Sequence, residues 1–418
     1  MRYAVMKNYT LITKCRVCGS KKLTPVVRIK PQFIASTFVK TNKNNPKSKI
    51  KIPMTAMLCG KCGLVQLKET VEPDLLYSQY FYRSHVTKTM SRDLKTVVDD
   101  ALSRVKAKKG DAVLDIGCND GTMIAMFPDT LKRFGIDPAK NIDWSHLPKD
   151  ITIVNDYFPS NQLKKYRFKV ITSTAMFYDL NDPNKAVQDI KELLDDDGVL
   201  VIQVSYLYDT IKDMNFYDFC HEHLEYYSLR SIMELMGKNG MRVFDASTNA
   251  VNGGSLRILA SKKEAKRPES DNIKYLLLKE KVLHLEDRET YRVFEQLIGY
   301  STKRVREYIQ KQKGLVIGLG ASTKGNVLLQ ICGITKKILP YISERNPEKV
   351  GLRTLGDDIE LISEEQAREL KPACIFVIPW NFKAEIVDRE REYLDRGGTF
   401  LFIMPYPYVL TQNGEYRL

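Results

Sequence analysis

One stretch, residues 112–122, limits what this chain can fold into more than any other, and it reads A-V-L-D-I-G-C-N-D-G-T. A short apolar run leads into Gly117 and Gly121, and an apolar segment follows. This order predicts a buried parallel strand, a glycine turn and a helix. Glycine lets the backbone approach a ligand closely, and the N-terminus of a helix offers free N–H groups. The stretch therefore predicts a cofactor-binding turn at the edge of a parallel sheet.

The residues between the two glycines narrow the kind of cofactor. A dinucleotide fingerprint reads G-x-G-x-x-G, but Cys118 and Asn119 stand where its second glycine is expected, so a pyrophosphate is a poor fit. The stretch resembles the first motif of the class I S-adenosylmethionine (AdoMet)-dependent methyltransferases. The alternative is a chance pair of glycines after a core strand.

The region from residue 110 to 262 alternates apolar runs with helical segments, which predicts a parallel sheet covered on both faces. Ligands bind such sheets at the carboxyl ends of the strands. Two later runs flank Asn252-Gly-Gly254 and predict an antiparallel hairpin that closes the sheet. The predicted strands are 112–116, 132–136, 151–155, 168–174, 199–205, 241–245 and 255–260.

Three acids, Asp115, Asp137 and Asp156, stand at or near the ends of three successive predicted strands. At such a position Asp137 can accept hydrogen bonds from both ribose hydroxyls of AdoMet, and Asp156-Tyr-Phe158 can contact its adenine. Three acids placed in this way are harder to attribute to accident than one. The residues predicted to bind AdoMet are Asp115, Gly117, Asn119, Asp120, Gly121, Asp137, Asp156, Tyr157, Phe158 and Ser173.

The N-terminal part carries two C-x-x-C pairs, Cys15/Cys18 and Cys59/Cys62, each followed by glycine as in a zinc knuckle. Four thiolates give closed tetrahedral coordination, which makes a structural zinc site rather than a catalytic one. Such a site supplies folding energy to a piece too small for a large core. The alternative is two unrelated pairs of reduced thiols.

Two of the five histidines of the chain fall in Cys220-His-Glu-His223, after the fifth predicted strand. H-x-H can mark a metal pair, but the neighbouring sequence suggests no third ligand. A histidine oriented by a carboxylate and acting as a base explains the group better. An ordinary core histidine is the alternative for one of the two.

The C-terminal third repeats the pattern of strand, glycine turn and helix at residues 315–325 and predicts a second, smaller Rossmann-like sheet. Ser322 and Lys324 fall at the predicted helix N-terminus, where an anion can bind. A role as scaffold alone stays open for this part. Residues 268–313 read as long, charged amphipathic helix leading into it.

The net charge of +14 is compatible with a solvated surface or with an anionic partner such as a nucleotide-linked small molecule. The basic residues are not clustered with aromatic ones, and we expect no nucleic acid partner. No apolar run is long enough to span a bilayer, and the N-terminus is too polar for a signal peptide. We therefore expect a cytoplasmic protein that has no membrane partner. We also expect a monomer.

Taken together, these motifs resemble those of the nucleotide-sugar C-methyltransferases, which include the C-3 methyltransferases of branched deoxysugars such as mycarose, tetronitrose and virenose. The resemblance covers essentially the whole chain. It rests on the four-cysteine knuckle, H-E-H-x-x-Y-Y-S at 221–228, N-G-G-S at 252–255, G-A-S-T-K-G-N at 320–326, E-R-N-P at 344–347 and P-W-N-F at 379–382.

The resemblance implies a role for each matching residue. His223 becomes the general base with Glu222 beside it, and Tyr80 and Tyr82 are placed at the sugar. The full set that we predict is His223, Glu222, His221 and Tyr80 for catalysis, and Tyr80, Tyr82, Asn252, Ser255, Arg257, Ser322 and Lys324 for substrate binding. The chain departs from some members in two places: Cys220 replaces a tyrosine, and Phe177 replaces a histidine after the fourth strand.

The predicted reaction transfers a methyl group from AdoMet to C-3 of a dTDP- or GDP-linked 4-keto-6-deoxyhexose. The neighbouring carbonyl acidifies the C-3 proton, and a histidine near its reference pKa of about 6.5 can remove it. The rival functions are a sugar O-methyltransferase, an RNA or protein methyltransferase, and a sugar-nucleotide binding protein without activity. The expected domains are a zinc-binding module (1–75), the class I methyltransferase core (76–265) and a C-terminal Rossmann-like α/β domain (266–418).

Overall fold

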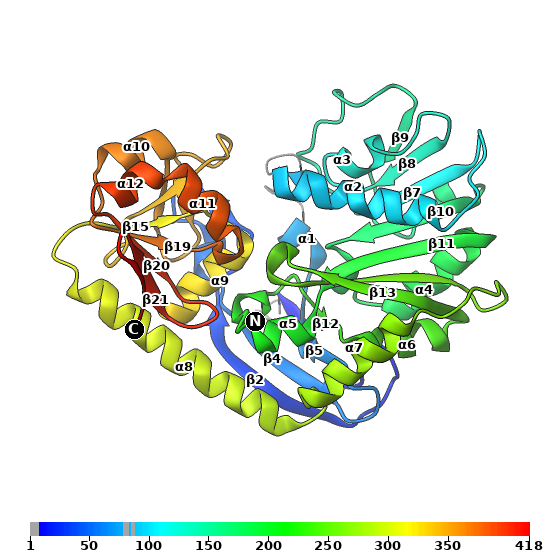
Figure 1. The fold of residues 1–418 in the computed structure, drawn as a ribbon, viewed down its shortest axis with the longest axis horizontal. Coiled ribbons are helices and arrows are strands. Elements are labelled where there is room, and N and C mark those ends of the chain that lie inside the picture. The colour runs from blue at the N-terminus through cyan, green and yellow to red at the C-terminus, as the bar shows by residue number, and fades with distance from the viewer. Residues whose placement is uncertain (1–7, 78–82, 85–87) are drawn as a thin grey trace, which may run out of the picture.

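A computed structural model of the protein describes residues 8–77, 83–84 and 88–418. Two lobes lie side by side, each built on its own large sheet, and a smaller antiparallel sheet lies between and beneath them (Figure 1). The predicted Tyr80 and Tyr82 lie outside the described residues. Within the described ranges, each helix is too short or too polar to cross a membrane.

The first lobe holds a seven-stranded sheet in which five neighbouring strands are parallel and the last two form the predicted antiparallel hairpin. Its central strand β7 is buried along its whole length, as its unbroken apolar run predicts. In spatial order the strands are β13 (Met241–Asn249), β14 (Ser255–Lys262), β11 (Leu194–Ser205), β10 (Phe168–Thr174), β7 (Ala112–Ile116), β8 (Lys132–Ile136) and β9 (Ile151–Val154).

Helices cover both faces of this sheet (Figure 1). Helices α2 (Lys88–Ser103) and α3 (Thr122–Ala125) pack on one face, where α2 buries Leu94, Val97, Val98 and Ala101 at helical spacing. The opposite face is covered by α4 (Pro183–Leu193), α6 (Leu229–Lys238) and α7 (Asp271–Val282). The short helix α5 (Leu207–Lys212) follows β11.

The second lobe holds a nine-stranded sheet, which has more strands than the first sheet although each strand is at most four residues long. The sheet is large because a C-terminal hairpin extends one edge and strand β3, from the N-terminal part, extends the other. In spatial order the strands are β22 (Gly414–Arg417), β21 (Tyr408–Thr411), β20 (Thr399–Phe402), β19 (Cys374–Val377), β15 (Val316–Leu319), β16 (Tyr341–Glu344), β18 (Glu360–Ser363), β17 (Arg353–Thr354) and β3 (Phe38–Val39).

Helices surround the second sheet, and the long α8 runs along the outside of this lobe and against β2 (Figure 1). The glycine turn predicted at residues 320–325 leads from β15 into α9, and Gly333 ends this helix in the left-handed conformation. The helices of this lobe are α8 (Arg288–Lys311), α9 (Thr323–Cys332), α10 (Glu364–Glu369), α11 (Lys383–Arg389) and α12 (Arg391–Asp395).

The N-terminal module is interleaved with both lobes rather than attached to one of them. Its four-stranded sheet takes its edge strand β12 from the methyltransferase lobe, while β3 leaves the module to pair with β17 of the second lobe. Our domain boundaries at residues 75 and 265 stay predictions. Strands on opposite sides of each boundary are hydrogen-bonded to one another: β5 pairs with β12 across residue 75, and β3 pairs with β17 across both boundaries. The elements of the module are β1 (Tyr9–Leu11), β6 (Glu69–Val71), β2 (Leu23–Gln32), β4 (Ile52–Cys59), β5 (Val65–Leu67), β12 (Glu225–Tyr226) and α1 (Pro73–Tyr77).

Candidate functional site: a cofactor loop, a buried H-E-H turn and a four-cysteine cluster

The four predicted cysteines meet in one cluster. Their sulfur atoms all lie within 4.8 Å of one another, with Cys15 Sγ 3.6 Å from Cys62 Sγ and Cys18 Sγ 3.5 Å from Cys59 Sγ. Zn–S bonds of about 2.3 Å in a tetrahedron place sulfur atoms about 3.8 Å apart. The cluster therefore fits one zinc ion held by four thiolates.

The arginine between the first two cysteines connects this cluster to the turn that carries the predicted base. Arg16 donates to Leu67 O at 2.7 Å and to Thr70 Oγ1 at 2.6 Å. Its Nε lies 3.6 Å from Glu225 Oε1, and both side chains are buried. Glu225 begins β12, two residues after His223. Through Arg16, the zinc cluster thus contacts the residues that directly follow the H-E-H turn.

The glycine loop after β7 has the shape that a class I cofactor site needs. Gly117 has a φ of +73°, and a Cβ placed there would meet Met176 Cγ at 2.4 Å, so glycine is required. Asp137 is buried, and its carboxylate accepts from the backbone N–H groups of Asn119 and Ala139, each at 2.9 Å. The acid predicted to hold the ribose therefore also fixes the loop.

The other predicted cofactor residues lie along the same edge of the sheet. Asp115 is buried and accepts from Thr172 Oγ1 at 2.9 Å, and burial raises its pKa to about 8. Asp156 and Tyr157, after β9, are exposed. Ser173 is fully buried, and its hydroxyl has no hydrogen-bond partner among the described residues. A buried hydroxyl of this kind at the strand edge, beside a glycine cradle, fits a ligand that supplies the missing contact.

The H-E-H turn is buried at the same carboxyl edge. His223 packs against Tyr178, with their ring centroids 4.1 Å apart, and Leu224 N donates to Tyr178 O at 2.8 Å. Tyr178 follows β10 by a few residues, and Met176, just before it, touches Gly117. The cofactor loop and the predicted base are therefore connected through one short segment.

Burial sets the protonation state of both histidines. It lowers the pKa of His223 well below 6.5, and the nearby charge of Lys324 lowers it further. We had expected His223 to have a pKa near the reference value of 6.5, but in the structure its pKa is lower. His221, which is 1% exposed, places Nε2 3.1 Å from Ile52 O, and burial lowers its pKa too. Both imidazoles are neutral at neutral pH.

The second lobe reaches this turn through Lys324, near the start of α9. Its Nζ lies 2.6 Å from Asp218 Oδ1 and 3.4 Å from the backbone O of Asn252. Asp218, in the 3-10 helix η5 (Phe216–Asp218), is 2% exposed. Ser322 instead caps α9, where its hydroxyl accepts from Gly325 N at 3.0 Å.

A second cross-lobe contact lies beside the first and joins two further predicted motifs. Trp380, in P-W-N-F, donates from Nε1 to Asn215 Oδ1 at 3.0 Å, and Asn215 in turn donates to Gly253 O at 2.6 Å. Motifs separated by more than a hundred residues in sequence therefore converge on the segment that precedes the H-E-H turn.

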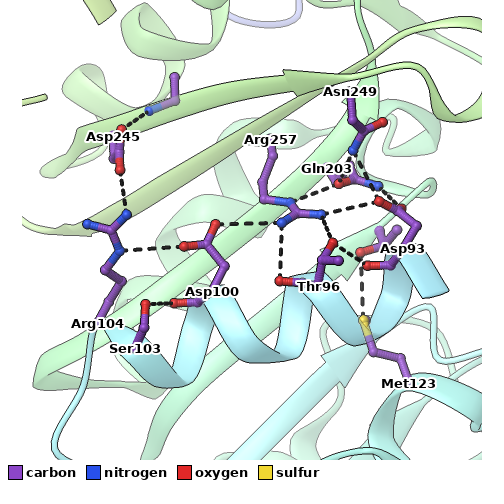
Figure 2. A network of polar contacts seen from close by, with 12 residues as sticks. Asp93, Thr96, Asp100, Ser103, Arg104, Met123, Gln203, Asp245, Asn249 and Arg257 are labelled. Carbon is purple, nitrogen blue, oxygen red and sulfur yellow. Dashed lines mark hydrogen bonds and ion pairs between the residues drawn. The ribbon is translucent and has the colours of Figure 1, made fainter. Parts of the chain in front are cut away.

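Arg257 and Ser255 were both predicted to bind the substrate, but in the structure both side chains hydrogen-bond other residues of the protein. Figure 2 shows the Arg257 guanidinium between Asp93, Thr96 and Asp100 of α2 and Gln203 of β11. It donates to Gln203 Oε1 at 2.9 Å and to Thr96 Oγ1 at 2.8 Å. Ser255 donates to Val251 O at 2.9 Å. Their roles at the substrate stay predictions, and the visible role of Arg257 is to fasten α2 to the sheet.

Our sequence reasoning missed Tyr178 and Asp218. Tyr178 stands next to Phe177, the position where some relatives carry histidine, so the departure noted there pointed to the right segment. Asp218 precedes the H-E-H turn closely and is the acid nearest before it. Its partner Lys324 was singled out only for its place at a helix N-terminus, because the pairing joins two lobes.

Comparison with known proteins matches three successive parts of the chain. Family profiles match residues 15–77 ("Putative zinc binding domain"), 83–246 ("Methyltransferase domain") and 250–405 ("C-methyltransferase C-terminal domain"). The C-methyltransferase NovU of Streptomyces niveus is 28% identical over 409 residues, which cover 96% of this chain and 97% of NovU.

Two solved methyltransferase structures each resemble about two fifths of the chain. One is the glycopeptide N-methyltransferase MtfA with AdoMet, at 12% identity and a TM-score of 0.33. The match covers 40% of this chain and 93% of MtfA. The other is the plantazolicin methyltransferase BpumL with S-adenosylhomocysteine, at 15% identity and a TM-score of 0.33. The match covers 41% of this chain and 82% of BpumL. At these TM-scores the likeness carries no argument about function.

The three profiles follow one another along most of the chain, and the alignment with NovU covers 96% of it. The four-cysteine cluster and the glycine loop supply the geometry that a zinc-binding module and a methyltransferase core require. The protein is therefore an AdoMet-dependent C-methyltransferase with a structural zinc site, and it is similar to C-methyltransferases along most of its length.

Proposed function

We propose that this enzyme methylates C-3 of a nucleotide-linked 4-keto-6-deoxyhexose, with His223 as the base that removes the C-3 proton. The observation that carries the proposal is the position of His223. It is buried and neutral, and it packs on the segment that also touches the glycine loop of the cofactor site. The substrate class comes from the resemblance of the motifs to the nucleotide-sugar C-methyltransferases.

The surroundings of His223 suit proton abstraction from carbon. A base must be unprotonated to accept a proton, and burial keeps this imidazole neutral. The same burial makes it a weak base, so the reaction depends on stabilisation of the enolate that forms. Lys324 supplies a positive charge near this turn, and its electrostatic effect reaches His223.

His223 takes the C-3 proton, and the electron pair of the C–H bond moves into the enolate, whose negative charge rests on the C-4 oxygen. Bound AdoMet supplies an electrophilic methyl group on a sulfonium centre. As the new C–C bond forms at C-3, the S–CH3 bond breaks with its electron pair going to sulfur, which leaves S-adenosylhomocysteine. The carbonyl is restored, and the proton on His223 passes to solvent.

The second lobe gives a reason for the size of the enzyme. A sugar nucleotide carries a long anionic handle, and binding energy from a remote handle can position the reacting carbon. The Lys324–Asp218 pair and the Trp380–Asn215 hydrogen bond hold this lobe against the segment before the H-E-H turn. A change at the handle-binding lobe is therefore transmitted to the base through direct contacts.

Mass spectrometry of dTDP- and GDP-linked 4-keto-6-deoxyhexoses, each incubated with AdoMet and enzyme, tests this function. A sugar nucleotide that gains one methyl group only when active enzyme is present supports it. The His223→Asn variant is the control, and we expect it to bind AdoMet normally. If wild-type enzyme leaves each of these acceptors unchanged, the proposed substrate class is wrong.

A further inference from the structure

A segment of the zinc-binding module, residues 32–38 (Q-F-I-A-S-T-F), lies where the module touches the second lobe. Asn326 of α9 donates from Nδ2 to Ala35 O at 2.6 Å. Gln330 of α9 accepts from Phe33 N at 2.8 Å and donates to Phe33 O at 3.3 Å. These bonds fix the backbone of the 32–38 segment against the helix that also carries Lys324.

The same segment contacts the H-E-H turn. Ala35 packs with Cys220 and with Val327 of α9 in one small apolar cluster. Ile52, the cross-strand partner of Gln32, places its carbonyl oxygen 3.1 Å from His221 Nε2. The 32–38 segment therefore lies between the turn of the predicted base and the helix of the second lobe.

Several polar atoms at this junction are buried without a hydrogen-bond partner among the described residues. Gln32 is 2% exposed, and neither its amide oxygen nor its amide nitrogen is paired; Ser36 is 4% exposed with an unpaired hydroxyl. His221 Nδ1 and Asn326 Oδ1 are unpaired as well. Buried polar groups in folded proteins are normally paired, so a cluster of unpaired ones at a single junction needs an explanation.

Residues elsewhere in the chain show what a purely structural polar group looks like. Gln66, in the same module, is also fully buried; its Oε1 accepts from Arg16 N at 3.0 Å, while its Nε2 has no partner among the described residues. Ser231 is fully buried and bonds Ser228 in a capping box. Gln32 and Ser36 make no such bonds within the described ranges. Packing alone would favour apolar side chains at their positions.

We propose that Gln32 and Ser36 hydrogen-bond the acceptor sugar, so that the zinc-binding module forms one wall of the acceptor site and takes part in substrate selection. This inference rests on the proposed sugar-nucleotide function and deepens it. A ring with several hydroxyl groups and a carbonyl is the fitting ligand. Each hydroxyl both donates and accepts, and an amide beside a hydroxyl offers both partners.

The placement of these two residues gives the module a second role beside zinc binding. We assign them to the acceptor rather than to AdoMet, because the neighbours of their segment are the H-E-H turn and α9 of the second lobe. A site that hydrogen-bonds a substrate hydroxyl discriminates strongly against an analogue that lacks it. The 32–38 segment would then help decide which sugar is methylated.

The test compares Gln32→Met and Ser36→Ala with the matched controls Gln66→Met and Ser231→Ala. Three quantities are measured for each variant: Tm without ligand, Kd for AdoMet, and kcat and KM for dTDP- and GDP-linked 4-keto-6-deoxyhexoses. We expect Gln32→Met and Ser36→Ala to keep or raise Tm, to keep the AdoMet Kd, and to raise the acceptor KM about three- to tenfold per lost hydrogen bond. The controls should lower Tm and keep the acceptor KM.

Two results would overturn the inference. One is a fall in Tm for Gln32→Met and Ser36→Ala with an unchanged acceptor KM, which would assign both side chains to the fold. The other is wild-type Tm and wild-type acceptor KM together. Failure of the proposed function is a separate result, in which wild-type enzyme methylates neither acceptor, and the inference would then fall with it.

Discussion

Lys324 of the second lobe lies 2.6 Å from Asp218 of the methyltransferase lobe, and Asp218 is almost fully buried. The pair joins a helix N-terminus to the segment that leads into the H-E-H turn. A buried carboxylate that loses its cation is left uncompensated. This contact is therefore where we expect the second lobe to affect the chemistry most directly.

Lys324→Met should destabilise the protein by roughly 2 kcal/mol, less than a fully buried pair would lose, because Lys324 is 23% exposed. Adding Asp218→Asn should restore much of the Tm without restoring the rate. Lys336→Met removes an exposed partner of Asp358 and serves as the control, with a change below about 0.5 kcal/mol. Equal losses in the two lysine variants, measured by thermal unfolding, would contradict a special role for this pair.

The pH dependence of the rate should reflect the lowered pKa of His223. The neutral imidazole is the active form, so kcat/KM falls as pH decreases through this pKa, and the fall should begin below pH 6.5. Because Lys324 contributes to the lowering, Lys324→Met should move the acid limb to higher pH. His223→Asn should lose roughly 10²–10⁴ in rate while keeping AdoMet affinity. An acid limb above 6.5 in wild-type enzyme would exclude this base.

Metal analysis should find about one zinc per chain, as a closed four-thiolate site requires. Cys59→Ser should lose soluble protein rather than activity alone, because the cluster packs into the main core beside the methyltransferase sheet. Cys332→Ser, which changes a buried thiol outside the cluster, is the comparison for the effect of losing a sulfur atom. Active protein that carries no metal would contradict the assignment.

Asp137→Ala should weaken AdoMet binding measured by calorimetry. The carboxylate is expected to accept from the ribose, a charge-assisted contact worth roughly 1.5–3 kcal/mol, which corresponds to about 10- to 150-fold in Kd. It also accepts from the N–H groups of Asn119 and Ala139, so the variant should loosen the loop as well. Asp129→Ala, at an exposed position, should leave the Kd unchanged. Unchanged affinity in Asp137→Ala would show that another residue holds the ribose.

The strands of the methyltransferase sheet could be predicted because each contains a short, mostly apolar stretch near turn residues. The cysteine cluster could be predicted because its spacing repeats. In contrast, β3 and β12 are only two residues long and carry no periodic signal, yet they connect the N-terminal module to both lobes. Their pairings depend on chain segments far apart in sequence, which local patterns do not reveal.

The residues of the site likewise fall into those that the sequence predicted and those that only the fold reveals. His223, Glu222 and Lys324 stood out because charged or basic residues fell within recognisable motifs. Arg257 stood out for the same reason, but Asp93, one of its main partners, is 164 residues away on α2, and no local pattern indicates that bond. Gln32 and Ser36 carried no sequence signal at all. They are notable only because the fold buries them beside the H-E-H turn.

The central claim is that the methyl group is transferred to C-3 of the sugar through an enolate. Nuclear magnetic resonance of the product made with AdoMet labelled by ¹³C in its methyl group tests it most directly. We predict a labelled methyl bonded to a carbon that bears no hydrogen, next to the C-4 carbonyl. A labelled methyl on oxygen, with hydrogen still at C-3, would contradict the account.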